Sequence, residues 1–414
     1  MSWFSRLAYA VLWLFIFSIP SEKILEIPNL GTMTRLIGFA AVGAGILALG
    51  VEQRVRIPSL FHVIVSLFML WAYASSHWTV GMDFTEARRS TYIQLLVMVM
   101  LLWQFADSEQ RLRGLMAAYS LGTIVNFADT VRRYLEQDET MYQRYATTGF
   151  DPNDLALTLA LSLPLSYYVW LHGKTVWRWI FPVQMLWTMS CIFLTASRGG
   201  TMCMLLALTF IFWTRNLLST RARVALIFCG VTALAGILPL VPATTWKRLA
   251  TLGSEVSEGT LNNRTVIWRQ GWEDFAEHAL VGVGTGAYPN GPAVVHQFGH
   301  RRMPGTFTPV AHNTFFSILT ETGVIGFGLF AWMLFILVSG VRKLRGADRA
   351  LWLTLLAVWS LGVMSLTWEE RKPTWLLFAL VLGHTAARRI APSAEDRDFR
   401  LIFAPALRPK ELAW

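Results

Sequence analysis

About a dozen apolar segments follow one another along this 414-residue chain, each near the length of a membrane span. A helix needs about 20 mostly apolar residues to cross a bilayer, with about 17 as the lower limit. By that rule, spans are predicted near 4–20, 33–50, 58–77, 89–106, 112–130, 154–172, 179–197, 200–214, 223–241, 312–340, 350–367 and 374–387. Only 15% of the residues are charged, against roughly 25% in soluble domains. The sequence therefore predicts an all-α, polytopic integral membrane protein with about twelve transmembrane helices.

Basic residues concentrate in alternate loops, for example at Arg54 and Arg56 and again at Arg342 and Lys343. The formal charge of +10 is therefore spread over short loops, which membrane topology explains better than nucleic-acid binding. The positive-inside rule places these loops, and with them both termini, in the cytoplasm. We expect the lipid bilayer as a partner and no nucleic acid.

The chain is predicted to form a single transmembrane domain, 1–414, with one large extracytoplasmic loop at 242–311. This loop contains a predicted amphipathic helix at 263–277 and a glycine-rich turn at 282–286.

One side of the predicted loop helix carries Trp268, Gly271, Trp272 and Phe275. Neither an Asp-rich metal motif nor a nucleotide-binding fingerprint occurs in the sequence, so no metal and no cofactor is expected.

Arg198 is the only charged residue between 179 and 213, and it lies in the motif Thr195-Ala-Ser-Arg-Gly-Gly200. The motif is expected to form a tight Gly-Gly turn between two spans at the outer surface. An arginine there is costly unless it is paired. It either extends to lipid headgroups or binds an anion beside glycines that expose backbone N–H groups, and the second interpretation is favoured.

Further arginines are predicted on the same face of the membrane. Arg264 begins the loop helix, Arg301 and Arg302 follow in the same loop, and Arg88 and Arg89 precede a span. Guanidinium groups pair bidentately with phosphate oxygens, so the cluster predicts a site for a lipid-linked phosphate or pyrophosphate.

His312 opens a long apolar helix in this interpretation. A helix N-terminus disfavours imidazolium, so His312 should be neutral and able to accept a proton, although it could also merely cap a turn. His296 and His300 compete for the same role from within the loop. Glu321 lies about two and a half turns further along, as either a hydrogen-bonded structural acid or a functional one.

Asp151 and Asn153 precede the sixth predicted span. Asp or Asn before an apolar run is first of all a helix cap. A second role, in holding a sugar or a divalent ion, is the alternative.

Taken in order, these motifs resemble the O-antigen ligase and polymerase superfamily of membrane glycosyltransferases. The motifs are Gly149-Phe-Asp-Pro-Asn-Asp-Leu-Ala156, Thr195-Ala-Ser-Arg-Gly-Gly200, Asn263-Arg264 with Trp268 ahead of Gly282-Val-Gly-Thr-Gly286, and His312-Asn313 with Glu321-Thr-Gly-Val-Ile-Gly326. One departure is Glu277-His-Ala-Leu280, where many relatives have a proline before the glycine-rich turn.

The resemblance implies a GT-C-like fold whose periplasmic loop closes over the site. It also implies transfer of a glycan from undecaprenyl pyrophosphate without metal or nucleotide. Arg198 and Arg264 would hold the pyrophosphate, and His312 would lie at the reacting centre. Residues of the same motifs would support the substrate, namely Asn313, Asn153, Asp151, Trp268 and Glu321.

The favoured function is therefore an O-antigen ligase of the bacterial inner membrane with a periplasmic active site. It would join the glycan to a lipid A–core acceptor and invert the anomeric centre, with His312 as base. A polymerase of O-antigen or exopolysaccharide would use the same donor and a growing glycan chain as acceptor, and a protein O-glycosyltransferase would share this chemistry. A lipid-linked sugar transporter is the alternative from another class. Transporters tend to place charged sites near the midplane between repeated halves, and no such repeat is evident here.

Overall fold

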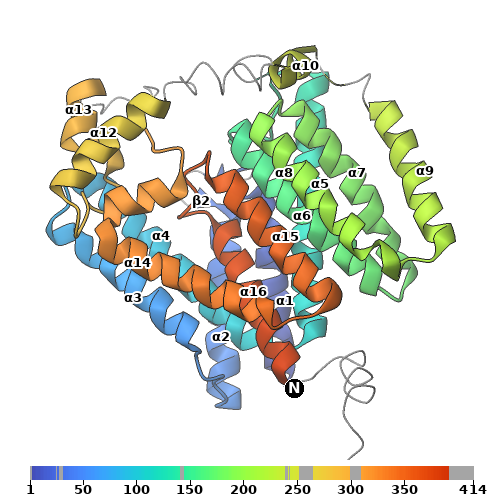
Figure 1. The fold of residues 1–414 in the computed structure, drawn as a ribbon. Helices are drawn as coiled ribbons and strands as arrows, with labels where there is room; N and C mark the ends of the chain where they lie inside the picture. The colour runs from blue at the N-terminus through green and yellow to red at the C-terminus, as the bar shows by residue number, and fades with distance from the viewer. Residues whose placement is uncertain are drawn as a thin grey trace, which may run out of the picture.

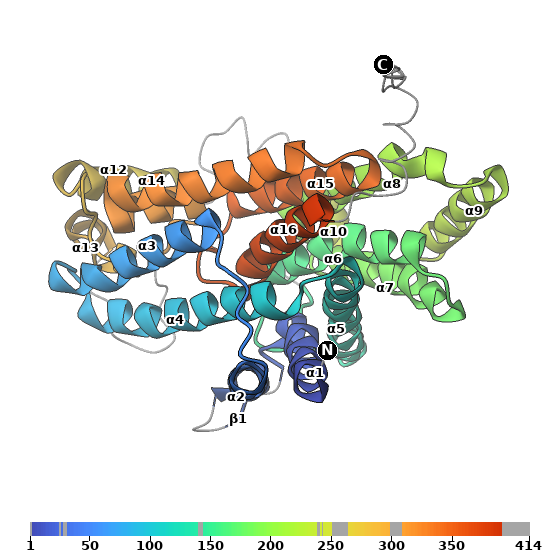
Figure 2. The same ribbon diagram turned by 90° about the horizontal axis from the view of Figure 1, so that it is seen from below.

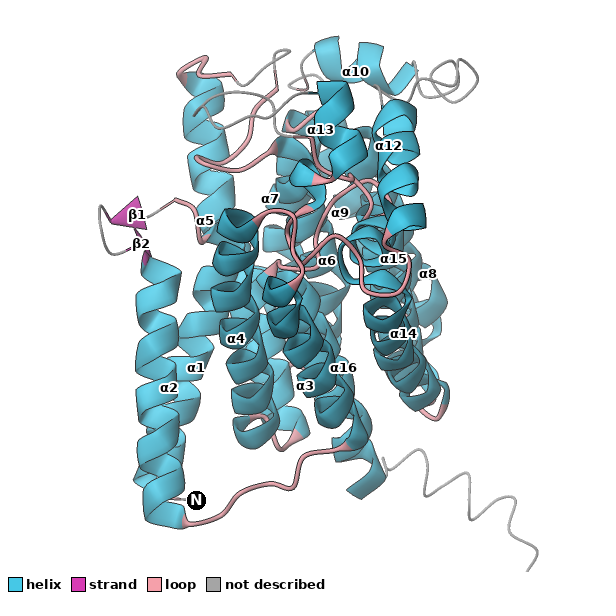
Figure 3. Ribbon diagram, turned by 90° about the vertical axis from the view of Figure 1, so that its left-hand side faces the viewer, coloured by secondary structure: helices cyan, strands magenta, loops and turns pink. Residues whose placement is uncertain are grey.

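The computed structural model describes residues 2–24, 26–27, 31–139, 144–237, 241, 243–250, 264–298 and 309–390. These parts of the chain are helical apart from short connections and one small hairpin (Figure 3). In the hairpin, β1 (Glu26–Ile27) pairs antiparallel with β2 (Gly31–Thr32). The prediction of an all-α polytopic membrane protein is confirmed.

Each of the twelve predicted spans coincides with a helix. The helices are α1 (Trp3–Ser18), α2 (Met33–Glu52), α3 (Leu60–Ala74), α4 (Met82–Phe105), α5 (Glu109–Leu135), α6 (Pro152–His172), α7 (Ile180–Leu194), α8 (Arg198–Thr214), α9 (Thr220–Ile237), α14 (Thr314–Arg342), α15 (Gly346–Val363) and α16 (Lys372–Ile390). Among the described residues, 6 helical segments are long and apolar enough on their own to cross a membrane.

The remaining helices belong to the predicted large loop. They are α10 (Ala243–Ala250), α12 (Arg264–Glu277) and α13 (Pro292–Phe298), and all three lie at the same end of the bundle (Figure 3). Helices α12 and α13 are neighbours, whereas α10 lies apart from them, above α5 and α8 (Figure 1). The predicted loop helix at 263–277 corresponds to α12.

The bundle has two flanks. Figure 1 shows α3, α4 and α14 on one flank and α5 to α9 on the other, with α15 and α16 between them. Of the six described helices that are long and apolar enough to cross a membrane, α6 is the most enclosed, since 83% of its apolar window is buried. Packing and interhelical hydrogen bonds hold membrane helices together. Accordingly, Ser166 of α6 donates to Gln184 of α7 at 2.6 Å, and Gln184 donates to Thr123 of α5 at 2.6 Å.

Helix α14 is interrupted at Gly323, where φ is 66° and ψ is −172°. Only glycine adopts this conformation readily, and the break leaves backbone groups of a spanning helix without their usual partners. The glycine-rich loop provides new ones: Val283 N–H donates to the Thr320 carbonyl at 3.0 Å, and Val324 N–H donates to the Ala279 carbonyl at 2.9 Å. The loop that follows α12 is thereby fastened to the middle of α14.

Candidate active site

The turn before α8 centres on Ala196, which has a left-handed φ of 48°. Ser197 caps α8 by accepting from the N–H of Gly200 at 3.1 Å, so Arg198 is the first residue of the helix. The expected Gly-Gly turn is therefore wrong, because Gly199 and Gly200 lie within the first turn of α8. Gly200 is instead needed for packing, since a Cβ there would lie 2.2 Å from the Cβ of Ala156.

Asn153 ties this turn to the start of α6. Its Oδ1 accepts from the Ser197 hydroxyl at 2.8 Å and from Nη2 of Arg144 at 2.9 Å. Nε of Arg144 donates to the Thr195 carbonyl at 2.8 Å. Arg144 is buried and was missed by the sequence reasoning, because a lone arginine in a connecting segment carries no pattern. Together these contacts fix the backbone that presents Arg198.

Asp151 caps α6, as predicted. Its Oδ1 accepts from the N–H of Asn153 at 2.8 Å and from that of Asp154 at 3.4 Å. Its negative charge also acts on Arg264 and on His312. The carboxylate therefore lies at the site as well as at the helix end.

Arg264 is the first residue of α12 and is half-buried. Burial and the positive charge of Arg198 lower the pKa of Arg264, against the effect of Asp151. Two arginines from distant parts of the chain, Arg198 and Arg264, thus lie close enough for their charges to repel. Such a pair favours an anion between them.

The side of α12 that carries Trp268, Gly271, Trp272 and Phe275 is only partly buried. Trp272 is 57% exposed, and the buried positions are Ile267, Gln270, Gly271 and Asp274. Asp274 anchors the buried side of the helix by accepting from the N–H of Ala293 in α13 at 2.7 Å. A polar anchor therefore decides which side of α12 packs.

Hydrogen bonds from two other segments fix the backbone around His312. Its N–H donates to Oγ1 of Thr367 at 3.0 Å, and the indole N–H of Trp268 donates to the Ala311 carbonyl at 2.7 Å. Asn313 caps α14 by accepting from the N–H of Phe316 at 3.1 Å. The prediction that His312 opens this helix is therefore wrong, because the helix begins at Thr314. His312 lies just before the cap, with a left-handed φ of 48°.

The surroundings of His312 favour the neutral form of its imidazole. The cause differs from the helix-end argument: burial and the positive charge of Arg264 hold the pKa of His312 below its usual value, and Asp151 opposes them. A neutral imidazole beside the Arg264 guanidinium can accept a proton.

Glu321 is a buried, hydrogen-bonded acid beneath the glycine-rich loop. Its Oε2 accepts from the N–H of Gly286 at 2.7 Å. The hydroxyl of Ser317 lies 3.4 Å from Glu321 Oε1 and 3.2 Å from Glu369 Oε1. Arg88 pairs with Glu369 at 3.3 Å. This cluster holds the loop against α14. Arg88, which was predicted to belong to the anion-binding cluster, forms an ion pair with Glu369 instead.

The connection before α16 was also missed by the sequence reasoning. Asp154 accepts from the indole N–H of Trp368 at 3.1 Å and from Nη2 of Arg371 at 2.9 Å. Lys372 pairs with Glu22 at 2.5 Å. A row of ion pairs therefore extends from the start of α6 towards α1.

Other predicted residues lie elsewhere. Arg89 pairs with Glu86 at 2.6 Å, and His296 is exposed on α13. Arg301, Arg302 and His300 lie outside the described residues. The described part of the chain contains no group of three or more His, Cys, Asp or Glu side chains suited to a metal ion.

Fold and site together define a polytopic α-helical membrane protein whose candidate site lies at the α12 end of the bundle. Residues 183–331 match the family model described as O-antigen ligase, which confirms the predicted resemblance to the O-antigen ligase and polymerase superfamily. The matched segment includes Arg198, Arg264 and His312 but not Asp151 or Asn153. No curated protein matches the chain.

Proposed function

We propose that this protein is an O-antigen ligase that transfers a glycan from undecaprenyl pyrophosphate to a lipid A–core acceptor, at the periplasmic face of a bacterial inner membrane. The observation that carries the proposal is that Arg264 interacts electrostatically both with Arg198 and with His312, and that the three residues come from three separate segments. Two interacting guanidinium groups suit a diphosphate. A neutral imidazole beside them suits removal of a proton.

In the proposed reaction, His312 takes the proton from an acceptor hydroxyl while that oxygen attacks the anomeric carbon of the donor. The bond between this carbon and the pyrophosphate oxygen breaks, and undecaprenyl pyrophosphate leaves with the electron pair. Arg198 and Arg264 stabilise the charge that develops on the leaving group. Direct displacement inverts the anomeric centre. A positioned base of this kind typically contributes about 10²–10⁴-fold.

A shallow pocket beside the site supports a glycan substrate. It is lined by Trp268, Trp272, Asn313 and Glu273, among others. Aromatic faces next to polar groups suit a sugar ring, which presents both C–H faces and hydroxyls.

The test uses purified protein with an undecaprenyl-pyrophosphate-linked glycan and three separate acceptors: lipid A–core, a growing glycan chain and a protein. A mass shift of lipid A–core supports the ligase, and extension of the glycan chain alone identifies a polymerase. Folded His312→Ala should lose about 10²–10⁴-fold in rate. His296→Ala is the matched control, because His296 is exposed on α13. Transfer by His312→Ala at the wild-type rate removes the base from the mechanism.

A further inference from the structure

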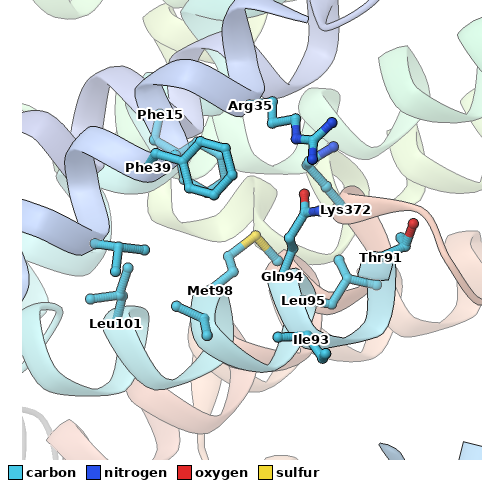
Figure 4. A pocket seen from close by; sticks show the side chains of 13 residues that line it. Phe15, Arg35, Phe39, Thr91, Ile93, Gln94, Leu95, Met98, Leu101 and Lys372 are labelled. Atoms are coloured by element: carbon cyan, nitrogen blue, oxygen red, sulfur yellow. The ribbon is translucent and has the colours of Figure 1, made fainter. Parts of the chain in front are cut away.

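A groove of about 250 Å³ lies between α1, α2 and α4, beside the first residue of α16. Most of its lining is apolar and includes Phe15, Phe39, Met98 and Leu101 (Figure 4). Neither the proposed mechanism nor the residues around His312 use this groove.

Polar groups gather at one end of the groove. Figure 4 shows Arg35, Gln94 and Lys372 together at that end, away from Leu101. Lys372 is already paired with Glu22 at 2.5 Å. By contrast, no carboxylate in the described part of the chain pairs with the guanidinium of Arg35. The groove therefore combines an apolar body with a cationic end.

The groove faces the bilayer. Helix α2 is the least enclosed of the apolar helices, with 22% of its apolar window buried. Phe39, which lines the groove, is itself 56% exposed. Thr91 and Leu101 mark the two ends of the lining on α4, ten residues apart. This corresponds to about 15 Å at a rise of about 1.5 Å per residue, which is half of a hydrocarbon core of about 30 Å. These dimensions suit a lipid of one leaflet, with its tail in the groove and an anionic headgroup at Arg35.

The groove lies across the bundle from the arginines of the candidate site. Figure 2 shows α1 and α2 on one side and α8, α14 and α15 on the other, with α6 and α16 between. Two substrates that are both anchored in the bilayer must approach one reacting centre through different sides of the protein. If Arg198 and Arg264 hold the donor pyrophosphate, the opposite side is open to the second lipid.

We propose that this groove binds the phosphorylated acyl lipid that carries the acceptor sugar, with a lipid phosphate at Arg35 and an acyl chain between α2 and α4. The proposal rests on the proposed function, from which the two lipid substrates follow. Arginine suits the phosphate because its N–H groups match phosphate oxygens.

The surface between groove and site suits an uncharged glycan. The Glu22–Lys372 and Asp154–Arg371 ion pairs lie between the groove and His312. Lys372 lines the groove, and Asp154 lies near Asp151, whose charge acts on His312. Each pair has no net charge, so its side chains can form hydrogen bonds with sugar hydroxyls without attracting or repelling a charged group. The sugars of the acceptor can extend over this row from the lipid headgroup towards His312.

Direct lipid binding tests the proposal independently of catalysis. The purified full chain is mixed with lipid A–core, undecaprenyl pyrophosphate or phosphatidylglycerol, and binding is measured by native mass spectrometry. Val42→Trp fills the groove from α2, and Leu47→Trp is its control, because Leu47 is 61% exposed and absent from the lining. Arg35→Gln removes the cation without adding bulk.

Arg35→Gln should weaken lipid A–core binding about tenfold or more, as expected for the loss of a hydrogen bond to a charged group. Val42→Trp should weaken it by a similar factor, because the indole occupies the space of the acyl chain. Undecaprenyl pyrophosphate binding should not change, and Leu47→Trp should behave as wild type. Arg35→Gln keeps the test decisive if Val42→Trp does not fold. Unchanged lipid A–core binding in Arg35→Gln overturns the proposal, as does selective loss of undecaprenyl pyrophosphate or phosphatidylglycerol. Loss of lipid A–core binding as expected, in a protein whose wild type transfers no glycan, supports the groove and refutes the proposed reaction.

Discussion

The contact between the glycine-rich loop and α14 makes a strong prediction for Gly323→Ala. The new Cβ would lie 2.2 Å from the Leu280 carbonyl oxygen, 2.4 Å from its carbon and 2.6 Å from the nitrogen of Val281. All three atoms are backbone, so no side chain can rotate away. The φ of 66° with ψ of −172° adds strain for any residue with a side chain.

The loss of stability in Gly323→Ala follows from the backbone strain and the steric overlap. Such backbone strain costs about 1–3 kcal/mol, and overpacking typically costs a further 1–3 kcal/mol. We expect about 3 kcal/mol or more, which is about 100-fold in an equilibrium constant. Docking of the loop onto α14 should become less favourable by this amount, because the undocked state is free of both the backbone strain and the steric overlap.

Hydrogen exchange of the purified protein measures this equilibrium. The amides of Val283 and Val324 bond across the contact, and their exchange in Gly323→Ala should accelerate about 100-fold. Gly328→Ala is the control in the same helix, because no atom lies within 4 Å of its Cβ position. Unchanged protection in Gly323→Ala would refute the account of the kink.

Three further outcomes are expected. In thermal unfolding, Glu321→Gln should remain close to wild type because an amide oxygen can still accept from Gly286, whereas Glu321→Leu should lose about 1–3 kcal/mol. Asn153→Ala leaves Ser197 without its acceptor, so glycan transfer should fall while the protein stays folded; full activity would show that this network does not position the site. Transfer should stay constant from neutral pH down past 6.5, the ordinary pKa of histidine, and decline only below it, because the neutral base persists until pH reaches the lowered pKa of His312; a decline beginning above pH 7 in initial-rate assays would contradict this.

The spans, the loop helix and the Asp151 cap could be predicted because each depends on residues that are neighbours in sequence. Hydropathy, periodicity and capping are all local properties. The order of the motifs also indicated Arg198, Arg264 and His312 as candidates, and the structure relates them through their charges.

Arg144, Glu369 and Arg371 were missed for a physical reason. The importance of each charged residue comes from a partner brought near by packing, such as Asp154 for Arg371. The role of Asp274 in packing α12 was missed for a similar reason, because its hydrogen bonds depend on a segment that follows later in the chain. Patterns of single residues do not encode such pairings.

Left-handed backbone at Ala196 and at His312 has a consequence for how the site is maintained. Each costs of order 1–3 kcal/mol for a residue with a side chain, so the folded protein holds both segments in shape before any substrate arrives. Selection for stability alone would favour glycine at position 196, which relaxes the turn at no steric cost. The same replacement would give the backbone before Arg198 more conformational freedom. A rigid backbone at this end of the bundle therefore lowers the stability of the folded protein. Substitutions that raise thermal stability and keep full turnover should lie elsewhere in the chain.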